Sequence, residues 1–587
     1  MGSVTILTNL RDNSRTGDAS GVHVGLGWAP LAWQVRWALC AIFLLGCYVQ
    51  YRHWSYFHEA GGMALGLDDA YISFRYARNW VDTGELSFNV GERGVAGFSN
   101  PLLVLLSALP YRALGQDAIY PAISLLSAVC GVLTLRFLHR RLSRQSGGFV
   151  ALGGALAFAA SPSIWLHTTS GLETGLVLCL QCFAWILSRE LLRARDDRLL
   201  PALLCVLAPL MPLRIDGFVL PATLAAYFFL QGRLKVSFAI VLVTSIMFAS
   251  VLLFYSGYYG DPLPNTVYAK VSGTLRERFW YALPFLPDIA AREGMWPSAF
   301  GLLLAPFVMR QQVHSRLERS RYVRWARSLP LEAFIIASLA AYYLLVGGDV
   351  FYERFLVLAF PAGATCWLES LRAVRVPRIG QGIAFAVMAL WPIGTIAADS
   401  RFTWVDEKYD EWITLGRFLG QHESGAFMAI DAAGKIPFYS RLRSLDMLGL
   451  SDYHIARMAP RADGHQVPGH NKYDPDYVLA SQPDLVVDWI FGDGSLAWGL
   501  TRQKLDRAGY HIKYLLSTVK QAKPADSVID VSGIQDLNLD ALTKQGYRHA
   551  VLTRRSPPRL DAQGTRAPSS TTTLPPLVDS VVAARDL

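Results

Sequence analysis

Long apolar runs separated by short arginine-rich segments most strongly constrain the fold of this chain. Hydrophobic residues make up 52% of the 587 residues and charged residues only 17%, whereas soluble domains average about 25% charged residues. Several uninterrupted runs are long enough to cross about 30 Å of hydrocarbon, which excludes a wholly soluble protein. We predict eleven spans, at 37–51, 118–137, 148–166, 173–188, 199–213, 217–231, 235–257, 295–309, 331–347, 355–371 and 379–397. The chain is therefore predicted to be a polytopic α-helical membrane protein.

The basic residues predict how these spans are oriented. The segment 101–114 is a twelfth candidate, but counting it as a span would place every basic tract on the outer side. If it lies at the membrane surface instead, the basic tracts within 136–144, 189–198, 233–235, 310–327 and 372–378 all fall on one side. The positive-inside rule makes that side cytosolic. We therefore expect a protein of the inner (plasma) membrane with its first periplasmic loop at 52–117.

The chain divides into a membrane domain at 31–397 and a hydrophilic domain at 398–555. In the second domain, strand-like runs at 426–430, 485–490, 512–516 and 550–553 accompany helical patterns at 411–422 and 496–508. This mixture predicts a periplasmic α/β domain. The polar ends, 1–30 and 556–587, are predicted to be disordered tails.

Charged residues at the outer ends of several spans predict a functional site on the outer face. Asp68 and Asp69 follow the first span, and we expect them at the turn into a helix, where one could cap the helix. They could be a solvated cap with a spare surface charge, or they could act as a general base or hold a divalent cation. The other polar residues at outer helix ends are Glu173, Arg214, Asp216, Asn265, Lys270, Asp349 and Arg354. Each alone could anchor a helix end, but together they favour the rim of a cavity whose cations hold a phosphate.

At these residues the sequence resembles the polytopic glycosyltransferases of the GT-C fold, which use polyprenyl-phosphate-linked sugars and carry an acidic pair in the first periplasmic loop. Among these, it more closely resembles the mycobacterial terminal β-(1→2)-arabinofuranosyltransferases and their bacterial relatives. The matching stretches are 68–102, 170–174, 214–217, 258–270, 347–355, 444–452 and 469–472. One departure is Ile215, where the Arg-Pro-Asp-Gly turn of such proteins has proline. That change removes no charged group.

The resemblance implies inverting transfer of a sugar, with arabinofuranose favoured, from a polyprenyl-phosphate donor. The acceptor would be a hydroxyl of a glycan or of a pilin-like protein. It implies a base at Asp68 or Asp69, phosphate binding by Lys270, Arg354 and Arg214, orienting roles for Glu173, Asp216, Asn265 and Asp349, and pocket closure by His470 and Lys472. Asp68 and Asp69 would also suit Mg²⁺ or Mn²⁺, and no other cofactor is expected.

Two other classes of protein fit parts of the pattern. A transporter or flippase of lipid-linked sugars would show inverted repeats and charges near the middle of the membrane, whereas these charges lie at helix ends. An envelope protein that binds glycan without chemistry would need only the hydrophilic domain. Nucleic acid is not an expected partner, because the net charge of +9 comes from short tracts between spans rather than from one basic face.

Overall fold

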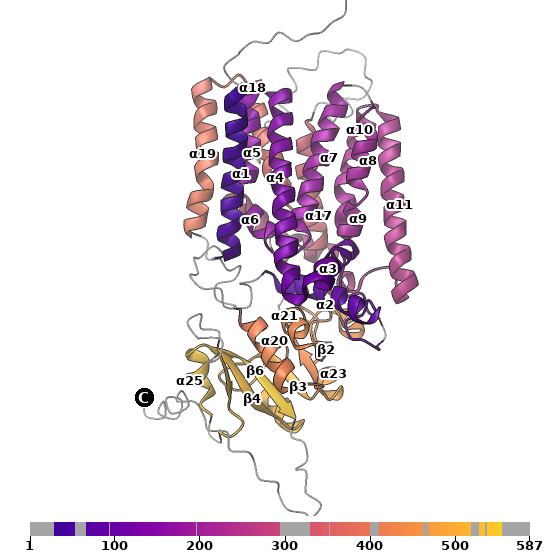
Figure 1. Cartoon of the computed structure of the whole chain (residues 1–587), viewed down its shortest axis with the longest axis vertical. Coiled ribbons are helices and arrows are strands. Elements are labelled where there is room, and N and C mark those ends of the chain that lie inside the picture. Colours follow the sequence, from indigo (N-terminus) through magenta and orange to yellow (C-terminus); the bar gives the residue numbers. More distant parts are fainter. Residues whose placement is uncertain are drawn as a thin grey trace, which may run out of the picture.

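The computed structural model describes residues 29–52, 66–92, 94–194, 197–293, 329–351, 353–398, 410–461, 467, 469–517, 527–534 and 537–554. The predicted span at 295–309 and most of both predicted tails lie outside these residues. A bundle of helices runs along the long axis of the molecule, and a sheet domain lies at one end of the bundle (Figure 1).

The bundle is formed by the apolar runs, and prolines interrupt several of them. Its described helices are α1 (Ala29–Arg52), α4 (Ile119–Ser146), α5 (Gly148–Ala159), α6 (Pro162–Thr168), α7 (Thr174–Ala194), α8 (Leu200–Leu207), α9 (Leu210–Leu213), α10 (Val219–Leu230), α11 (Leu234–Tyr259), α17 (Leu331–Val346), α18 (Ala359–Ala373) and α19 (Arg378–Ala398). Helices α5 and α6 meet at a 53° bend, where Pro162 begins α6 and the Ser161 hydroxyl caps it. Proline suits this first helical position because it has no N–H to leave unpaired.

Span number and span boundaries follow the sequence prediction only in part. Among the described residues, three helices are long and apolar enough to cross a membrane, Gln116–Ser146, Thr174–Ala194 and Leu234–Tyr259, and the bent pair α5–α6 would make a fourth. The total of eleven spans stays a prediction. The span predicted to begin at residue 355 is wrong at its start: residues 353–358 form turns and α18 begins at Ala359. Those turns bring Arg354 and Phe355 to the wall of a cavity instead.

Short helices lie at the ends of the spans: α2 (Asp68–Thr83), α3 (Pro101–Leu114), η1 (Gln116–Ala118), η2 (Ile215–Phe218), α12 (Asn265–Lys270), α13 (Leu275–Ala282) and α14 (Phe285–Arg292). Figure 1 shows α2 and α3 at the end of the bundle nearest the sheet domain. Helix α3 covers 101–114, the segment that we predicted to lie at the membrane surface. Helix α2 is followed by Gly84, whose φ of 82° is easily adopted by glycine.

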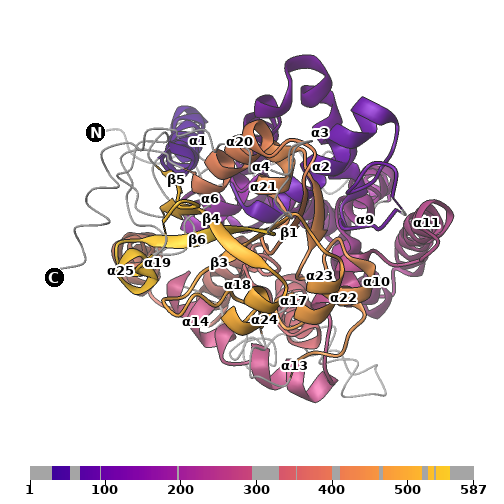
Figure 2. The ribbon, with the colours of Figure 1, turned by 90° about the horizontal axis from the view of Figure 1, so that it is seen from below.

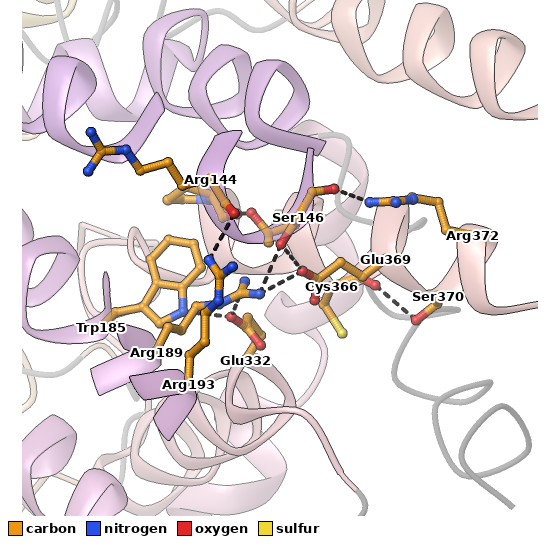
Figure 3. Close-up of polar contacts among 12 residues, drawn as sticks. Arg144, Ser146, Trp185, Arg189, Arg193, Glu332, Cys366, Glu369, Ser370 and Arg372 are labelled. Carbon is orange, nitrogen blue, oxygen red and sulfur yellow. Dashed lines mark hydrogen bonds and ion pairs between the residues drawn. The ribbon is translucent and has the colours of Figure 1, made fainter. Parts of the chain in front are cut away.

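A polar cluster joins four helices at the opposite end of the bundle (Figure 3). Arg189 of α7 donates to Glu332 of α17 at 2.8 Å and to Glu369 of α18 at 2.6 Å. It also donates to Ser146, the last residue of α4, at 3.1 Å. The Trp185 indole donates to Glu332 at 2.7 Å. The arginine-rich helix ends described here therefore gather at the end away from the sheet domain, as the orientation argument expects.

The C-terminal domain is built on a six-stranded sheet in the order β2-β1-β3-β6-β4-β5. Its strands are β1 (Phe427–Ile430), β2 (Arg443–Asp446), β3 (Leu485–Trp489), β4 (Tyr510–Ser517), β5 (Val528–Asp530) and β6 (Tyr547–Arg554), and its helices are α20 (Glu411–His422), α21 (Lys435–Ser440), α22 (Tyr453–Ala456), α23 (Pro475–Ala480), α24 (Arg502–Arg507) and α25 (Leu539–Lys544). Strand β1 pairs in parallel with β2 and β3, and the other pairings are antiparallel. This mixture confirms the predicted α/β domain, although the helix predicted at 496–508 is limited to α24.

The carboxyl end of β1 faces the membrane domain. Residues 431–434 lead from β1 into α21, and Figure 2, seen from the sheet end, shows α21 beside α2. The chain therefore brings a loop of the C-terminal domain to the start of α2, where the predicted acidic pair lies.

Candidate active site

One cavity lies where the end of the helix bundle meets the C-terminal domain. It contains about 890 Å³ of empty space, part of which is open to solvent. Seven charged side chains line it: Asp69, Glu173, Arg214, Asp216, Lys270, Asp349 and Arg354. They come from segments spread over nearly 300 residues, so the predicted convergence of acids and cations in one hollow is present. Four carboxylates against three cations leave one formal negative charge.

Asp69 and Lys270 form the ion pair of this cavity that is most open to solvent. The Lys270 ammonium donates to Asp69 Oδ2 at 2.9 Å, and the two side chains are about one quarter exposed. Burial alone would raise the pKa of Asp69, but the Lys270 ammonium, with smaller contributions from Arg354 and His470, lowers it below its ordinary value. The carboxylate therefore stays ionised and can accept a proton.

Asp68 points away from this cavity and toward the C-terminal domain. Its Oδ2 accepts the backbone N–H of Gly434 at 2.9 Å, and its Oδ1 accepts that of Lys435 at 2.7 Å. Burial raises the pKa of Asp68 to about 7, although these two N–H groups favour the ionised form and so act in the opposite direction. The expectation that one aspartate caps α2 is wrong, because Asp68 is already the first helical residue and its carboxylate binds another helix. The two neighbours have different partners, since adjacent helical side chains diverge by about 100°.

A chain of polar contacts lies along another part of the cavity wall. Ser73 donates to the Asn100 side-chain oxygen at 2.8 Å, and the Asn100 amide donates to Glu173 at 2.8 Å. Glu173 lies 3.7 Å from Arg214, which pairs with Asp216 at 2.7 Å. Burial raises the pKa of Asp216, although the positive charge of Arg214 acts to lower it. These contacts fix Arg214 at the mouth of the bundle.

A further part of the cavity wall carries a second arginine, Arg354, which contacts an acid and aromatic rings. Arg354 Nε donates to Asp349 Oδ2 at 2.7 Å, and its Nη2 lies 3.3 Å from Oδ1. The Phe355 ring lies beneath both arginines, with the Arg214 guanidinium 4.3 Å and the Arg354 guanidinium 5.4 Å from its centre. Burial alone would lower the pKa of Arg354, but Asp349 raises it, so the group stays charged. Two cations that share one ring suit a phosphate group.

Three of the predicted site residues, one orienting and two pocket-closing, do not line the cavity. Asn265 and Lys472 bind backbone carbonyl groups across the domain boundary. The His470 ring packs against Trp498, with ring centres 5.9 Å apart, and is close enough to Asp69 to lower its pKa. Asn265 and Lys472 therefore hold the walls of the site rather than face its contents.

As the chain is folded, three of the four oxygens of the acidic pair face hydrogen donors. Both oxygens of Asp68 face backbone N–H groups, and Oδ2 of Asp69 faces an ammonium group. Metal ions take deprotonated ligands with free lone pairs. Within the described ranges, no three His, Cys, Asp or Glu side chains come together as metal ligands would.

Sequence reasoning missed several residues of the cavity. Asn100 lies in the matching stretch 68–102 but carries no charge, so it gave no signal of its own. Phe355 was assigned to a membrane span. Leu450, which also lines the cavity, comes from the loop after β2 of the C-terminal domain. A neutral or apolar wall residue becomes recognisable only when its spatial neighbours are known.

Comparisons with known proteins agree with this architecture. A family described as a domain of unknown function, DUF8728, matches residues 402–551. The terminal beta-(1->2)-arabinofuranosyltransferase of Mycobacterium tuberculosis (strain ATCC 25618 / H37Rv) is 28% identical over 319 residues, which are 49% of this chain and 50% of the relative. The chain thus matches about half the length of that relative.

Two solved structures have a similar fold. ArnT from Cupriavidus metallidurans bound to undecaprenyl phosphate matches with a TM-score of 0.51 and 13% identity, over 91% of this chain and 99% of that chain. The Archaeoglobus fulgidus oligosaccharyltransferase matches with a TM-score of 0.51 and 12% identity, over 86% and 74%. The chain therefore has the fold that the sequence predicted, a polytopic GT-C membrane domain followed by a C-terminal sheet domain.

Proposed function

We propose that this chain is an inverting glycosyltransferase that moves a sugar from a polyprenyl-phosphate donor to an acceptor hydroxyl. The observation that carries this proposal is the cavity in which an ionised carboxylate, Asp69, lies beside three cations, Lys270, Arg214 and Arg354. Arabinofuranose is the first candidate sugar, because the mycobacterial relative is an arabinofuranosyltransferase. A polyprenyl-phosphate donor is supported by the fold shared with ArnT, whose structure holds undecaprenyl phosphate.

The residues suit each step of such a transfer. Asp69 takes the proton of the acceptor hydroxyl, and the acceptor oxygen bonds to the anomeric carbon. The bond between that carbon and the phosphate oxygen breaks at the same time, and polyprenyl phosphate leaves with one more negative charge. Lys270, Arg214 and Arg354 stabilise that developing charge. No general acid is needed, because phosphate leaves without being protonated, and the proton on Asp69 passes to solvent.

The site would face the periplasm in a bacterial inner membrane. The arginine-rich cluster lies at one end of the bundle and the cavity at the other, and the positive-inside rule assigns the arginine-rich end to the cytosol. A lipid-linked donor would enter the cavity from the membrane, and a glycan would approach from the side of the C-terminal domain. A pilin-like protein is the second candidate acceptor.

The experiment uses the purified full chain with synthetic polyprenyl-phosphoryl-arabinofuranose and an oligo-arabinofuranoside. We expect transfer by the native chain and a loss of about 10²- to 10⁴-fold in kcat in Asp69→Asn, the usual contribution of a general base. The control is Asp476→Asn, the same chemical change at a side chain that is 78% exposed. Wild-type turnover in folded Asp69→Asn would disprove the base assignment. Movement of the lipid-linked donor across liposome membranes without sugar transfer would favour the flippase hypothesis instead.

A further inference from the structure

We propose that the C-terminal domain positions the Asp69–Lys270 ion pair by holding the two short helices that carry it, α2 and α12. Asp68, Asn265 and Lys472 are the positioning residues of this arrangement. The inference rests on the proposed function, since it concerns the base of that reaction. It also gives a role to the domain whose family is described as one of unknown function.

The α2 contact, formed by Asp68, Arg75 and Arg78 of α2 with α21, binds both ends of that six-residue helix. At its start, the Asp68 carboxylate accepts the N–H groups of residues 434 and 435 at 2.9 and 2.7 Å. A side chain at residue 434 would clash with the Asp68 backbone, because the Cβ of any residue other than glycine would lie 2.0 Å from the Asp68 carbonyl oxygen. This close approach explains the glycine at that position.

At the other end of α21, the two arginines of α2 bind backbone carbonyl groups. Arg75 donates to the carbonyls of Pro437 and Leu442 at 2.6 and 2.8 Å, and Arg78 donates to that of Phe438. The last carbonyls of a helix are short of partners within it, and here those of Pro437 and Phe438 accept arginine donors across the domain boundary. Both arginines are buried, so the contact fixes the rotation of α2 and therefore the direction of Asp69.

The α12 contact, formed by Asn265 and by the backbone of α12 with residues 449–457 and Lys472, holds the helix that carries Lys270. The Asn265 amide donates to the carbonyls of Gly449 and Asp452 at 2.8 and 2.9 Å, and its oxygen accepts from Arg457 at 2.7 Å. The Lys472 ammonium donates to the carbonyl of Tyr268 at 2.7 Å and to that of Ala456 at 2.8 Å. Lys472 is 6% exposed. Its charge therefore serves this contact and not the cavity.

These contacts matter because α12 is too short to hold its own position. It has six residues, and isolated helices shorter than about 12 residues are marginal in water. Asp69 and Lys270 are 201 residues apart in the sequence. Each lies on a helix that is bonded to the same domain, so that domain sets the distance between them.

The experiment measures kcat/KM against pH, which reports the pKa of the free enzyme, for the native full chain, for Lys472→Met and for the control Lys504→Met. Methionine keeps most of the lysine stem but removes the donors. Lys504 lies on the same domain in an exposed ion pair with Asp476 at 2.6 Å. In the native chain Lys270 lowers the pKa of Asp69, so activity should persist down to at least about pH 5. In Lys472→Met, α12 shifts and Asp69 loses the Lys270 ammonium as a neighbour. The pH at which activity falls on the acid side of the profile (the acid limb) should therefore rise by about one pH unit or more, the usual effect of one opposite charge.

A loss of rate without a shift of the acid limb would mean that Lys472 serves stability alone and would overturn the proposal. An unchanged rate and an unchanged limb would overturn it as well. If Lys472→Met does not fold, Asn265→Ala is measured in the same way, because it removes other hydrogen bonds between α12 and the C-terminal domain.

Hydrogen exchange of the backbone amides of α2 and α12 separates this proposal from the proposed function. We expect exchange in 265–270 to rise at least threefold in Lys472→Met and to stay unchanged in Lys504→Met. If the native chain transfers no sugar, the proposed function fails, yet this measurement still shows whether the C-terminal domain holds α12. Equal exchange in all three proteins would overturn the contact itself.

Discussion

Asp349→Asn should bind polyprenyl phosphate more tightly than the native chain. Asp349 pairs with Arg354 at 2.7 Å, and their side chains are only 4% and 9% exposed. Asparagine keeps the shape of the acid and can still accept from Arg354, but it removes one of the four carboxylates of the cavity. The cavity then has no formal net charge, and Arg354 is available to an anion.

The gain follows from the charge that is removed. A phosphate bound on the far side of the guanidinium would lie about 7 Å from Asp349, and at an effective dielectric constant of about 20 the repulsion is about 2 kcal/mol. Relief of that repulsion tightens Kd by about 30-fold. Slower release of the phosphate product should lower kcat at the same time.

The assay titrates polyprenyl phosphate against the full chain in lipid nanodiscs. Asp476→Asn is the matched control and should leave Kd unchanged, because Asp476 lies on the exposed surface of the C-terminal domain. Thermal unfolding shows whether each variant is folded. Unchanged or weaker binding by folded Asp349→Asn would refute the placement of the phosphate at Arg354.

Two further predictions concern stability and metal ions. Arg189→Met leaves Glu332 and Glu369 without their shared partner and should destabilise the membrane domain by about 3–5 kcal/mol, the usual cost of breaking a buried pair; a native unfolding temperature in detergent would contradict this. Transfer should survive EDTA, because both oxygens of Asp68 and Oδ2 of Asp69 already face hydrogen donors. Loss of activity that Mn²⁺ restores would instead place a cation in the site.

The charged walls of the site could be predicted from the sequence, because a charge at the end of an apolar run is costly unless it is used or paired. Glu173, Arg214 and Arg354 were found in this way, and all three line the cavity. The different roles of Asp68 and Asp69 could not be predicted. They depend on backbone N–H groups 366 and 367 residues away. Every residue except proline has a backbone N–H group, so the residue type does not show which of them will bind a distant carboxylate.

The same limit applies to the C-terminal domain. Strand β2 (Arg443–Asp446) was missed, because its sequence, Arg-Ser-Leu-Asp, has no apolar alternation. Its pairing with β1 comes from the sheet and not from local preference. The sequence predicts that Lys472 and Asn265 face a ligand, and the structure shows them bound to backbone carbonyl groups instead. A polar side chain that binds a distant carbonyl group looks the same in sequence as one that binds a substrate.

The ion pairs of the cavity bear on how one site can bind an anion and also supply a base. Lys270 is bonded to Asp69 before any donor arrives, so on the proposed function a phosphate gains Lys270 only by competing with Asp69. A carboxylate that loses an ammonium neighbour holds a proton more tightly. Donor binding therefore makes Asp69 a stronger base while the donor is in place. Phosphate binding and proton removal are coupled through Lys270, and the strength of that coupling depends on where the C-terminal domain holds α12.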